Sequence, residues 1–235
     1  MEKARIPSIK ISEIDMNKCY FNPGCALSTY KPESEHKILE ILNKYFGLGK
    51  IQLHNICCHH DPQLPKGSTI INNCAGCDRR YRSLYDGIQT ISLWEILSSI
   101  DNLPVPDHSG LTVSVQDSCS YRPKPQVHAA VRSILRKMNI NIVESKYSGT
   151  KSICCGDNFY PKLPIERVTE LQKKRASQMP CQDVVVYCVS CIKSMAIGDK
   201  TPHHMVDLIL NEATDPQETR IDVYHDELNK YIAEH

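Results

Sequence analysis

Ten of the twelve cysteines fall into two sets with the same order, and this pattern restricts the fold more than any other feature of the sequence. In each set a single cysteine is followed by an adjacent pair and then by a Cys-x-x-Cys motif. The first set is Cys25, Cys57, Cys58, Cys74 and Cys77. The second set is Cys119, Cys154, Cys155, Cys188 and Cys191. A pattern that occurs twice in one order indicates that the chain is built from two repeats.

The segments around the cysteines also match. "CALSTYKPESEHKILEIL" after the first single cysteine resembles "CSYRPKPQVHAAVRSIL" after the second, and "SLWEIL" (92–97) resembles "HMVDLIL" (204–210). A polar, proline-containing stretch at 101–110 separates the halves. We therefore predict a divergent first repeat over 14–103, a second repeat over 110–212, and a C-terminal extension over 213–235 whose short helix packs on its own domain.

Short β-branched runs lead directly into three of the cysteine positions. The runs are "STIIN" (68–72), "LTVSV" (111–115) and "DVVVY" (183–187). Helical periodicity is found between such runs, at 35–46, 127–138 and 165–179. Strands alternating with helices predict an α/β fold, here two tandem Rossmann-like repeats with parallel sheets. In such folds the functional groups gather at the carboxyl ends of the strands, where these cysteines are expected.

The two halves differ between the adjacent cysteine pair and the Cys-x-x-Cys motif. The first half has 15 residues there and the second has 32. A parallel crossover with a helix needs a dozen or more residues. We therefore expect a loop in the first half where the second has a helix. The first half also has His59 and His60 after its pair, where the second has Gly156 and Asp157.

Charge and hydropathy exclude several classes of partner. The net charge is +1, so no basic footprint for nucleic acid is present. No run approaches the roughly 18 apolar residues of a membrane span, and the start of the chain lacks the apolar core of a signal peptide. We expect a soluble, cytoplasmic protein. In a reducing compartment its cysteines are expected to bind metal or take part in redox chemistry.

The number of cysteines in each set indicates the kind of metal centre. A structural zinc site uses four ligands, and each set offers five thiols. Iron–sulfur clusters are also held by thiolates, and five suit an open cluster of several irons. Adjacent cysteines such as Cys154 and Cys155 can reach two irons of one cluster. Gly156 is expected to give the backbone room for a close approach.

The doubled pattern resembles the cysteine-rich CCG domain family over roughly residues 18–210. The family includes the cysteine-rich subunit of heterodisulfide reductase and related subunits of anaerobic glycerol-3-phosphate dehydrogenase and lactate-utilisation proteins. The resemblance implies one or two noncubane [4Fe–4S] clusters, held by the ten cysteines of the two sets, and reduction of a small disulfide. It also implies that the second set, complete with Gly156, is the active centre, whereas zinc is an alternative in the first half.

The chain carries no Gly-x-Gly-x-x-Gly motif after a strand, no Walker loop and no ferredoxin-type cysteine run. We therefore expect an iron–sulfur subunit of an anaerobic oxidoreductase that exchanges electrons with a flavoprotein or a ferredoxin-type subunit, with a small disulfide or thiol as substrate. One alternative is an electron relay as in lactate or glycerol-phosphate systems. Another is a zinc-stabilised scaffold without a redox role.

Several residues outside the two sets have more than one interpretation. A thioredoxin-like role for "CVSC" (188–191) leaves the other cysteines of that set unexplained. Cys19 and Cys181 lie outside the pattern and are expected to be buried small hydrophobes. The remaining candidates flank the motifs, as extra ligands or proton donors (His59, His60) or as positive charges near the centre (Arg79, Arg80, Lys193). Solvated helix faces are the simpler interpretation of the three basic residues.

Overall fold

The computed structural model describes residues 9–47, 49–216 and 219–235 and contains two four-stranded, all-parallel sheets. The first sheet has the order β2-β1-β3-β4 and the second the order β6-β5-β7-β8, so the chain builds both sheets in the same order. The strands of the first sheet are β1 (Cys19–Asn22), β2 (Gln52–Leu53), β3 (Thr69–Asn72) and β4 (Gln89–Ser92). Those of the second are β5 (Thr112–Gln116), β6 (Asn141–Ile142), β7 (Asp183–Val186) and β8 (Thr201–His204). The predicted α/β class with parallel sheets is confirmed.

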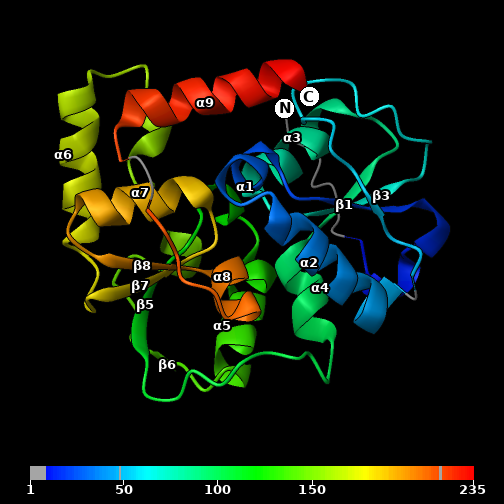
Figure 1. The fold of residues 1–235 in the computed structure, drawn as a ribbon, viewed down its shortest axis with the longest axis horizontal. Helices are drawn as coiled ribbons and strands as arrows, with labels where there is room; N and C mark the ends of the chain where they lie inside the picture. Colours follow the sequence, from blue (N-terminus) through cyan, green and yellow to red (C-terminus); the bar gives the residue numbers. More distant parts are fainter. Residues whose placement is uncertain (1–8, 48, 217–218) are drawn as a thin grey trace.

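Helices connect the strands, and the two halves lie side by side (Figure 1). The first half contains α1 (Cys25–Tyr30), α2 (Glu33–Leu42), α3 (Ala75–Leu84) and α4 (Leu93–Ser99). The second contains α5 (Pro125–Lys137), α6 (Ile165–Ala176), α7 (Val189–Ile197) and α8 (Met205–Leu210). The helices predicted at 35–46, 127–138 and 165–179 correspond to α2, α5 and α6.

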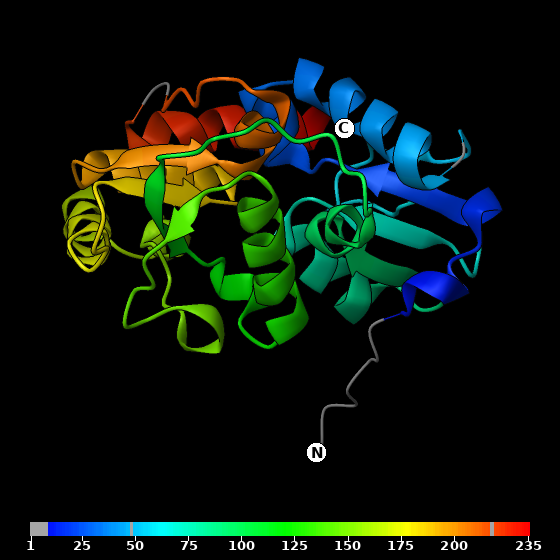
Figure 2. The same cartoon turned by 90° about the horizontal axis from the view of Figure 1, so that it is seen from below.

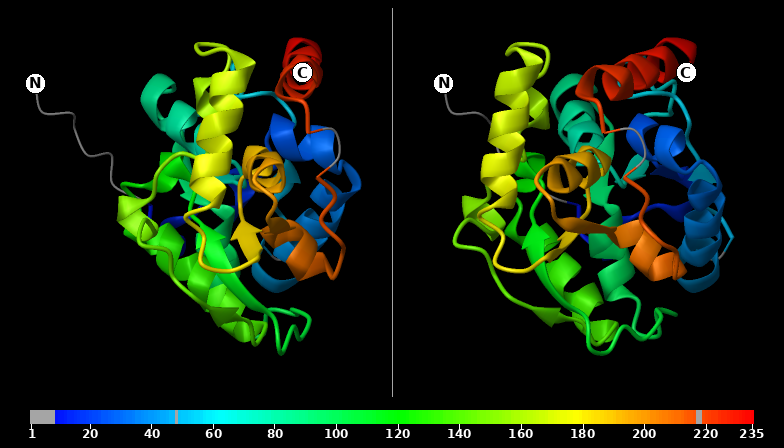
Figure 3. Two further views of the ribbon diagram at one scale, coloured as in Figure 1. Left: turned by 90° about the vertical axis from the view of Figure 1, so that its left-hand side faces the viewer. Right: turned by 60° about the vertical axis from the view of Figure 1, so that its left-hand side comes forward.

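The connection between β2 and β3 is the clearest difference between the halves. Residues 54–68 form neither helix nor strand, whereas α6 lies in the corresponding connection of the second half and packs beside α7 (Figure 3). The expected loss of the crossover helix is confirmed. The segment contains Pro62, Pro65 and Gly67, residues that disfavour a helix.

One hydrophobic core runs through both halves. Helices α4 and α5 pack against each other between the sheets (Figure 2), and Trp94 of α4 meets the Tyr187 ring edge to face at 6.1 Å. Trp94 and Tyr187 are both fully buried. Because the core continues across the boundary at 101–110, we expect the halves to unfold as one unit.

Two lysines, half-buried Lys31 and buried Lys124, tie the halves together in a reciprocal way. Lys31 of the first half pairs with Asp207 of α8 at 2.7 Å. Lys124 of the second half pairs with Asp78 of α3 at 3.1 Å. Each lysine directly precedes a proline in the matching segment after the single cysteine. Removing Lys31 would leave buried Asp207 without its partner charge, which is strongly destabilising. Removing Lys124 would leave Asp78 paired with Arg82 of its own helix alone, at 2.9 Å.

The C-terminal helix α9 (Ile221–Glu234) crosses both halves (Figure 1), so the expectation that it packs on its own domain is wrong. At its start, Tyr224 hydrogen-bonds Ser190 of α7 at 3.1 Å and His225 pairs with Asp157 at 3.2 Å. At its end, the N–H of Cys57 donates to the carbonyl of His235 at 3.0 Å. Fourteen residues of helix span about 21 Å, which is enough to reach from one half to the other.

None of the helices in the described ranges is long and apolar enough to cross a lipid bilayer.

Candidate functional site

The cysteines of both sets follow the carboxyl ends of strands, as predicted. In the first half they come after β1, β2 and β3, and in the second after β5, β6 and β7. The inner pairs β1–β3 and β5–β7 are parallel neighbours, with Asn22 opposite Asn72 and Gln116 opposite Val186. Parallel neighbours end at the same edge of a sheet, so each single cysteine is brought beside its Cys-x-x-Cys motif.

The five thiols of the first set interact as one chain, in the order Cys25, Cys57, Cys58, Cys77, Cys74. Hydrogen bonds from the thiols of Cys25 and then Cys58 lower the pKa of Cys57 to about 2. A hydrogen bond from Cys77 lowers the pKa of Cys74 to about 7. Thiolate forms are therefore favoured at two positions of the set, and thiolates are the forms that ligate metal.

The five thiols of the second set interact in the matching order, Cys119, Cys154, Cys155, Cys191, Cys188. Hydrogen bonds from Cys119 and then Cys155 lower the pKa of Cys154 to about 2. The N–H of Gly156 also donates to the Cys154 sulfur at 3.4 Å. Cys154 thus occupies the place in its set that Cys57 has in the first.

All twelve cysteines, which lie within the described residues, are free thiols. The structure brings together the ten predicted site cysteines as two sets of five and leaves the other two apart. Cys19 is buried at the start of β1. Cys181 is half-buried, and its N–H donates to the Ser114 hydroxyl at 3.1 Å. The interpretation of Cys19 as a buried small hydrophobe is confirmed.

The arrangement of the thiols differs from that of a single-ion site. Within the described ranges, no three His, Cys, Asp or Glu side chains are placed to hold one metal ion. The thiols nevertheless interact along each set, from Cys25 to Cys74 and from Cys119 to Cys188. Each set thus offers five thiols, the type of donor that holds iron–sulfur clusters.

Gly24 is a site residue that the cysteine pattern does not identify. It precedes Cys25 with φ +79°, and a Cβ there would lie 2.8 Å from Cys74 Cβ and 3.4 Å from Cys77 Sγ. Only glycine combines this backbone conformation with so close an approach. The "NPG" turn at the end of β1 is the feature of the sequence that could have indicated it.

Gly156 makes a close approach of a different kind from the one expected. Its φ is +113°, and a Cβ would lie 2.8 Å from Gln172 Cγ and 3.0 Å from the Gln172 backbone nitrogen. The crowded neighbour is therefore helix α6 and not the thiol set. Glycine at this position lets the adjacent cysteine pair lie directly against α6.

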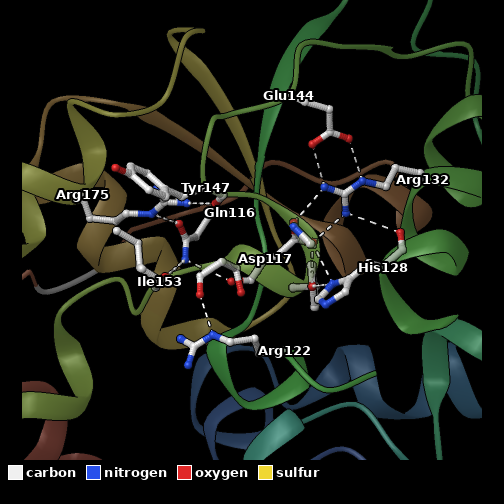
Figure 4. A network of polar contacts seen from close by, with 12 residues as sticks. Gln116, Asp117, Arg122, His128, Arg132, Glu144, Tyr147, Ile153 and Arg175 are labelled. Atoms are coloured by element: carbon white, nitrogen blue, oxygen red, sulfur yellow. Dashed lines mark hydrogen bonds and ion pairs between the residues drawn. The ribbon is translucent and has the colours of Figure 1, made fainter. Parts of the chain in front are cut away.

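A buried polar network fixes the second set (Figure 4). Asp117 accepts from both terminal nitrogens of Arg132, at 2.6 and 2.8 Å, and Arg132 also binds Glu144 at 2.8 and 2.9 Å. Asp117 accepts a further hydrogen bond from Tyr187 at 2.8 Å. Burial alone would raise the pKa of Asp117, but hydrogen bonds from His128 and Arg132 outweigh it and lower the pKa.

The same network holds the backbone just before the cysteine pair (Figure 4). The amide of Gln116 donates to the carbonyl of Ile153 at 3.2 Å, and Arg175 fixes that amide by donating to its oxygen at 2.6 Å. Arg122 donates to the carbonyl of Ser152 at 2.6 Å. The backbone that leads into the pair is thereby positioned from β5, from α6 and from the turn after the single cysteine.

A cavity of about 350 Å³ opens at the first set. Four of its thiols line the cavity: Cys25, Cys58, Cys74 and Cys77. Basic side chains line it as well, namely His59, Arg79 and Arg80, and the remaining wall includes Leu228 and Ile232 of α9. The cavity therefore combines thiols, basic groups and apolar groups in its lining.

Two of the three basic residues, Arg80 and Lys193, differ from the simple solvated interpretation, and Arg79 agrees with it. Arg80 is half-buried and donates to the carbonyl of Cys58 at 2.8 Å, whereas Arg79 is exposed at the cavity. Lys193 is buried, and its ammonium lies 4.8 Å from the centre of the Tyr224 ring. His60 binds the carbonyl of Ile232 at 2.7 Å, so its ring fastens the end of α9.

Neither a protein-family model nor a curated protein sequence matches this chain.

Proposed function

We propose that the chain is a tandem repeat of one thiolate-binding unit, that each repeat holds an iron–sulfur cluster, and that the protein is a redox subunit of an oxidoreductase. The observation that carries this proposal is the matching order of the thiols in the two sets, from Cys25 to Cys74 and from Cys119 to Cys188. Unrelated buried cysteines have no reason to interact in the same order twice.

The residues that would hold the clusters are the ten cysteines of the two sets. A cluster of the noncubane [4Fe–4S] kind supplies one-electron chemistry at a sulfur-binding iron. The protein provides a thiol of low pKa at the second place of each set, Cys57 and Cys154. Gly24 and Gly156 supply the close backbone approaches beside the sets. The fold also excludes water from four other thiols that are at most 5% exposed: Cys58, Cys77, Cys155 and Cys191.

The cavity at the first set supports that set as the side that meets a substrate. Four thiols line a space of about 350 Å³, which suits a small thiol or disulfide. Arg79 and Arg80 also line it and favour a substrate with negative charge. This assignment differs from the sequence-based expectation that the second set is the active centre. We assign electron storage and transfer to the second set instead.

The metal and sulfide content of anaerobically purified protein tests the proposal. We expect near eight irons and eight acid-labile sulfides per chain if two [4Fe–4S] clusters are present. Cys155→Ser is expected to lose about half of the iron, and Cys58→Ser the other half. Cys181→Ser, which removes a thiol outside both sets, is the matched control and is expected to keep all of it.

Two results would contradict the proposal. Stoichiometric zinc without sulfide would leave a zinc-stabilised scaffold, and equal iron in Cys155→Ser and Cys181→Ser would separate the metal from the thiol sets.

The substrate assignment has its own test. Reduced protein is mixed with a small anionic disulfide, and Arg79→Ala, which leaves the Arg80 hydrogen bond to Cys58 in place, should slow its reoxidation while the iron content stays unchanged. If reduced protein is not reoxidised at all, the electron-relay alternative is favoured.

A further inference from the structure

The segment that carries Cys154 and Cys155 presents an unusual amount of apolar surface. Six large hydrophobic residues are exposed in the described part of the chain, and three of them fall between 153 and 165. They are Ile153, Phe159 and Ile165, exposed to 37%, 39% and 39%, and we call them the apolar patch. Such grouping of exposed apolar side chains is typical of an interaction surface, since single ones are scattered in ordinary proteins.

Two backbone turns connect the residues of the apolar patch. Phe159 donates its N–H to the carbonyl of Gly156 at 3.1 Å, and Leu163 donates to the carbonyl of Phe159 at 3.0 Å. The chain thus turns twice between the cysteine pair and the start of α6 at Ile165. Helix α6 and the loop before it lie on the face turned toward the viewer in the left view of Figure 3.

Basic residues flank the apolar patch. Three exposed ones form what we call the basic rim: Arg122, Lys151 and Lys162. Arg122 is fixed beside the patch because its side chain donates to the carbonyl of Ser152. The acidic residue between 151 and 165, Asp157, is buried. Exposed Arg167 is paired with exposed Glu170, so Glu166 is the acidic charge that the three basic residues outweigh. The face is therefore locally positive although the whole chain has a net charge of only +1.

The apolar patch also lies beside the most accessible part of the adjacent cysteine pair. Ile153 directly precedes Cys154, which is half-buried, whereas Cys155 and Cys191 are buried. A protein docked here would bring its own redox group close to the second set. Apolar contact at the centre with complementary charge at the rim is typical of short-lived protein complexes, where charge steers the encounter.

We propose that the apolar patch and its basic rim are the docking surface for a small acidic electron-carrier protein. The inference rests on the proposed function, because it assigns the partner of the second set. One electron leaves the reduced carrier, which is thereby oxidised, and the group held by the second set is reduced by one electron. The first set, with its cavity, stays free for a small substrate.

Binding and electron transfer to a plant-type [2Fe–2S] ferredoxin, an acidic carrier, test the proposal. Affinity is measured anaerobically by calorimetry at low and high salt, and transfer by stopped-flow mixing with the reduced carrier. We expect measurable binding that weakens at least about tenfold at high salt. Phe159→Ser/Ile165→Ser and, separately, Lys151→Glu/Lys162→Glu should each weaken it about tenfold or more. The matched control, Tyr45→Ser/Val143→Ser, removes two exposed apolar residues elsewhere and should bind as the unchanged protein does.

Three results would overturn the proposal. The carrier does not bind, or the control variant weakens binding as much as the patch variant, or the chain forms a dimer that Phe159→Ser/Ile165→Ser dissociates. The last result would assign the apolar patch to a second copy of the chain. Iron and sulfide are measured on the same samples. Carrier binding to a protein without clusters would refute the proposed function and support the docking surface. Clusters in both sets without carrier binding would support the proposed function and refute the docking surface.

Discussion

Replacing Gly24 by alanine tests the tight contact at the first thiol set. At φ +79° and ψ 142° a residue with a Cβ is in a region almost reserved for glycine, which costs about 1–3 kcal/mol. The new Cβ would also lie 2.8 Å from Cys74 Cβ, and relieving such an overlap in a packed site costs about 1–3 kcal/mol more. We expect the free energy of unfolding to fall by about 2–6 kcal/mol.

A second glycine provides the control for this measurement. Gly67 has φ +85°, but no atom lies within 4 Å of the position that its Cβ would take, so Gly67→Ala carries only the backbone cost. Anaerobic urea unfolding measures both variants, and the extra loss in Gly24→Ala should lower its midpoint by about 1 M relative to the control. Gly24→Ala should also lose the iron of the first set alone. Equal midpoints for the two variants would refute the contact with Cys74 as a constraint on the fold.

Three further perturbations probe the interface, the histidines and the polar network. Asp78→Asn leaves buried Lys124 without its partner charge and should cost about 3–5 kcal/mol, and adding Lys124→Met should recover part of this in a double-mutant cycle. Burial lowers the pKa of His54 and His204 to about 4. In the unfolded chain the two imidazoles are protonated below about pH 6.5, whereas in the folded protein they are protonated only near pH 4. The free energy of unfolding therefore falls between these values as the pH decreases, by up to about 3 kcal/mol per histidine. Urea unfolding midpoints measured from about pH 6.5 to about pH 4 test this pH dependence, and His204→Asn should make the midpoint depend less on pH. Asp117→Asn removes the charge that Arg132 binds and should cost about 3–5 kcal/mol by urea unfolding, with loss of iron from the second set first.

Much of the fold could be predicted because its causes are local. The β-branched run at 183–187 and the helical periodicity at 127–138 are short-range features, and they correspond to β7 and α5. Two prolines and a glycine disfavour a helix between Cys58 and Cys74. The place of the cysteines at the carboxyl ends of strands followed from the runs that precede them. Periods and lengths of this kind can be read from the sequence residue by residue.

The features that were missed depend on contacts between distant segments. The pairing of Lys31 with Asp207 joins residues 176 positions apart, and nothing near either residue indicates it. The contact of Gln172 with Gly156 depends equally on how α6 packs. The C-terminal helix was predicted as a helix, but its path over both halves depends on where Ser190 and Cys57 lie in space.

The divergence of the first half explains why its thiols open onto a cavity. In the second half α6 covers the adjacent cysteine pair so closely that only glycine fits at 156. The first half has no such helix, and the end of α9 lies near its pair, where its carbonyls accept from Cys57 and bind His60. A helix supplied by the C-terminus covers the pair less completely than one built into the crossover, and Leu228 and Ile232 become part of the wall of a space of about 350 Å³. The short spacer, which made the first set the weaker match to the pattern, is therefore the feature that leaves a cavity beside its thiols.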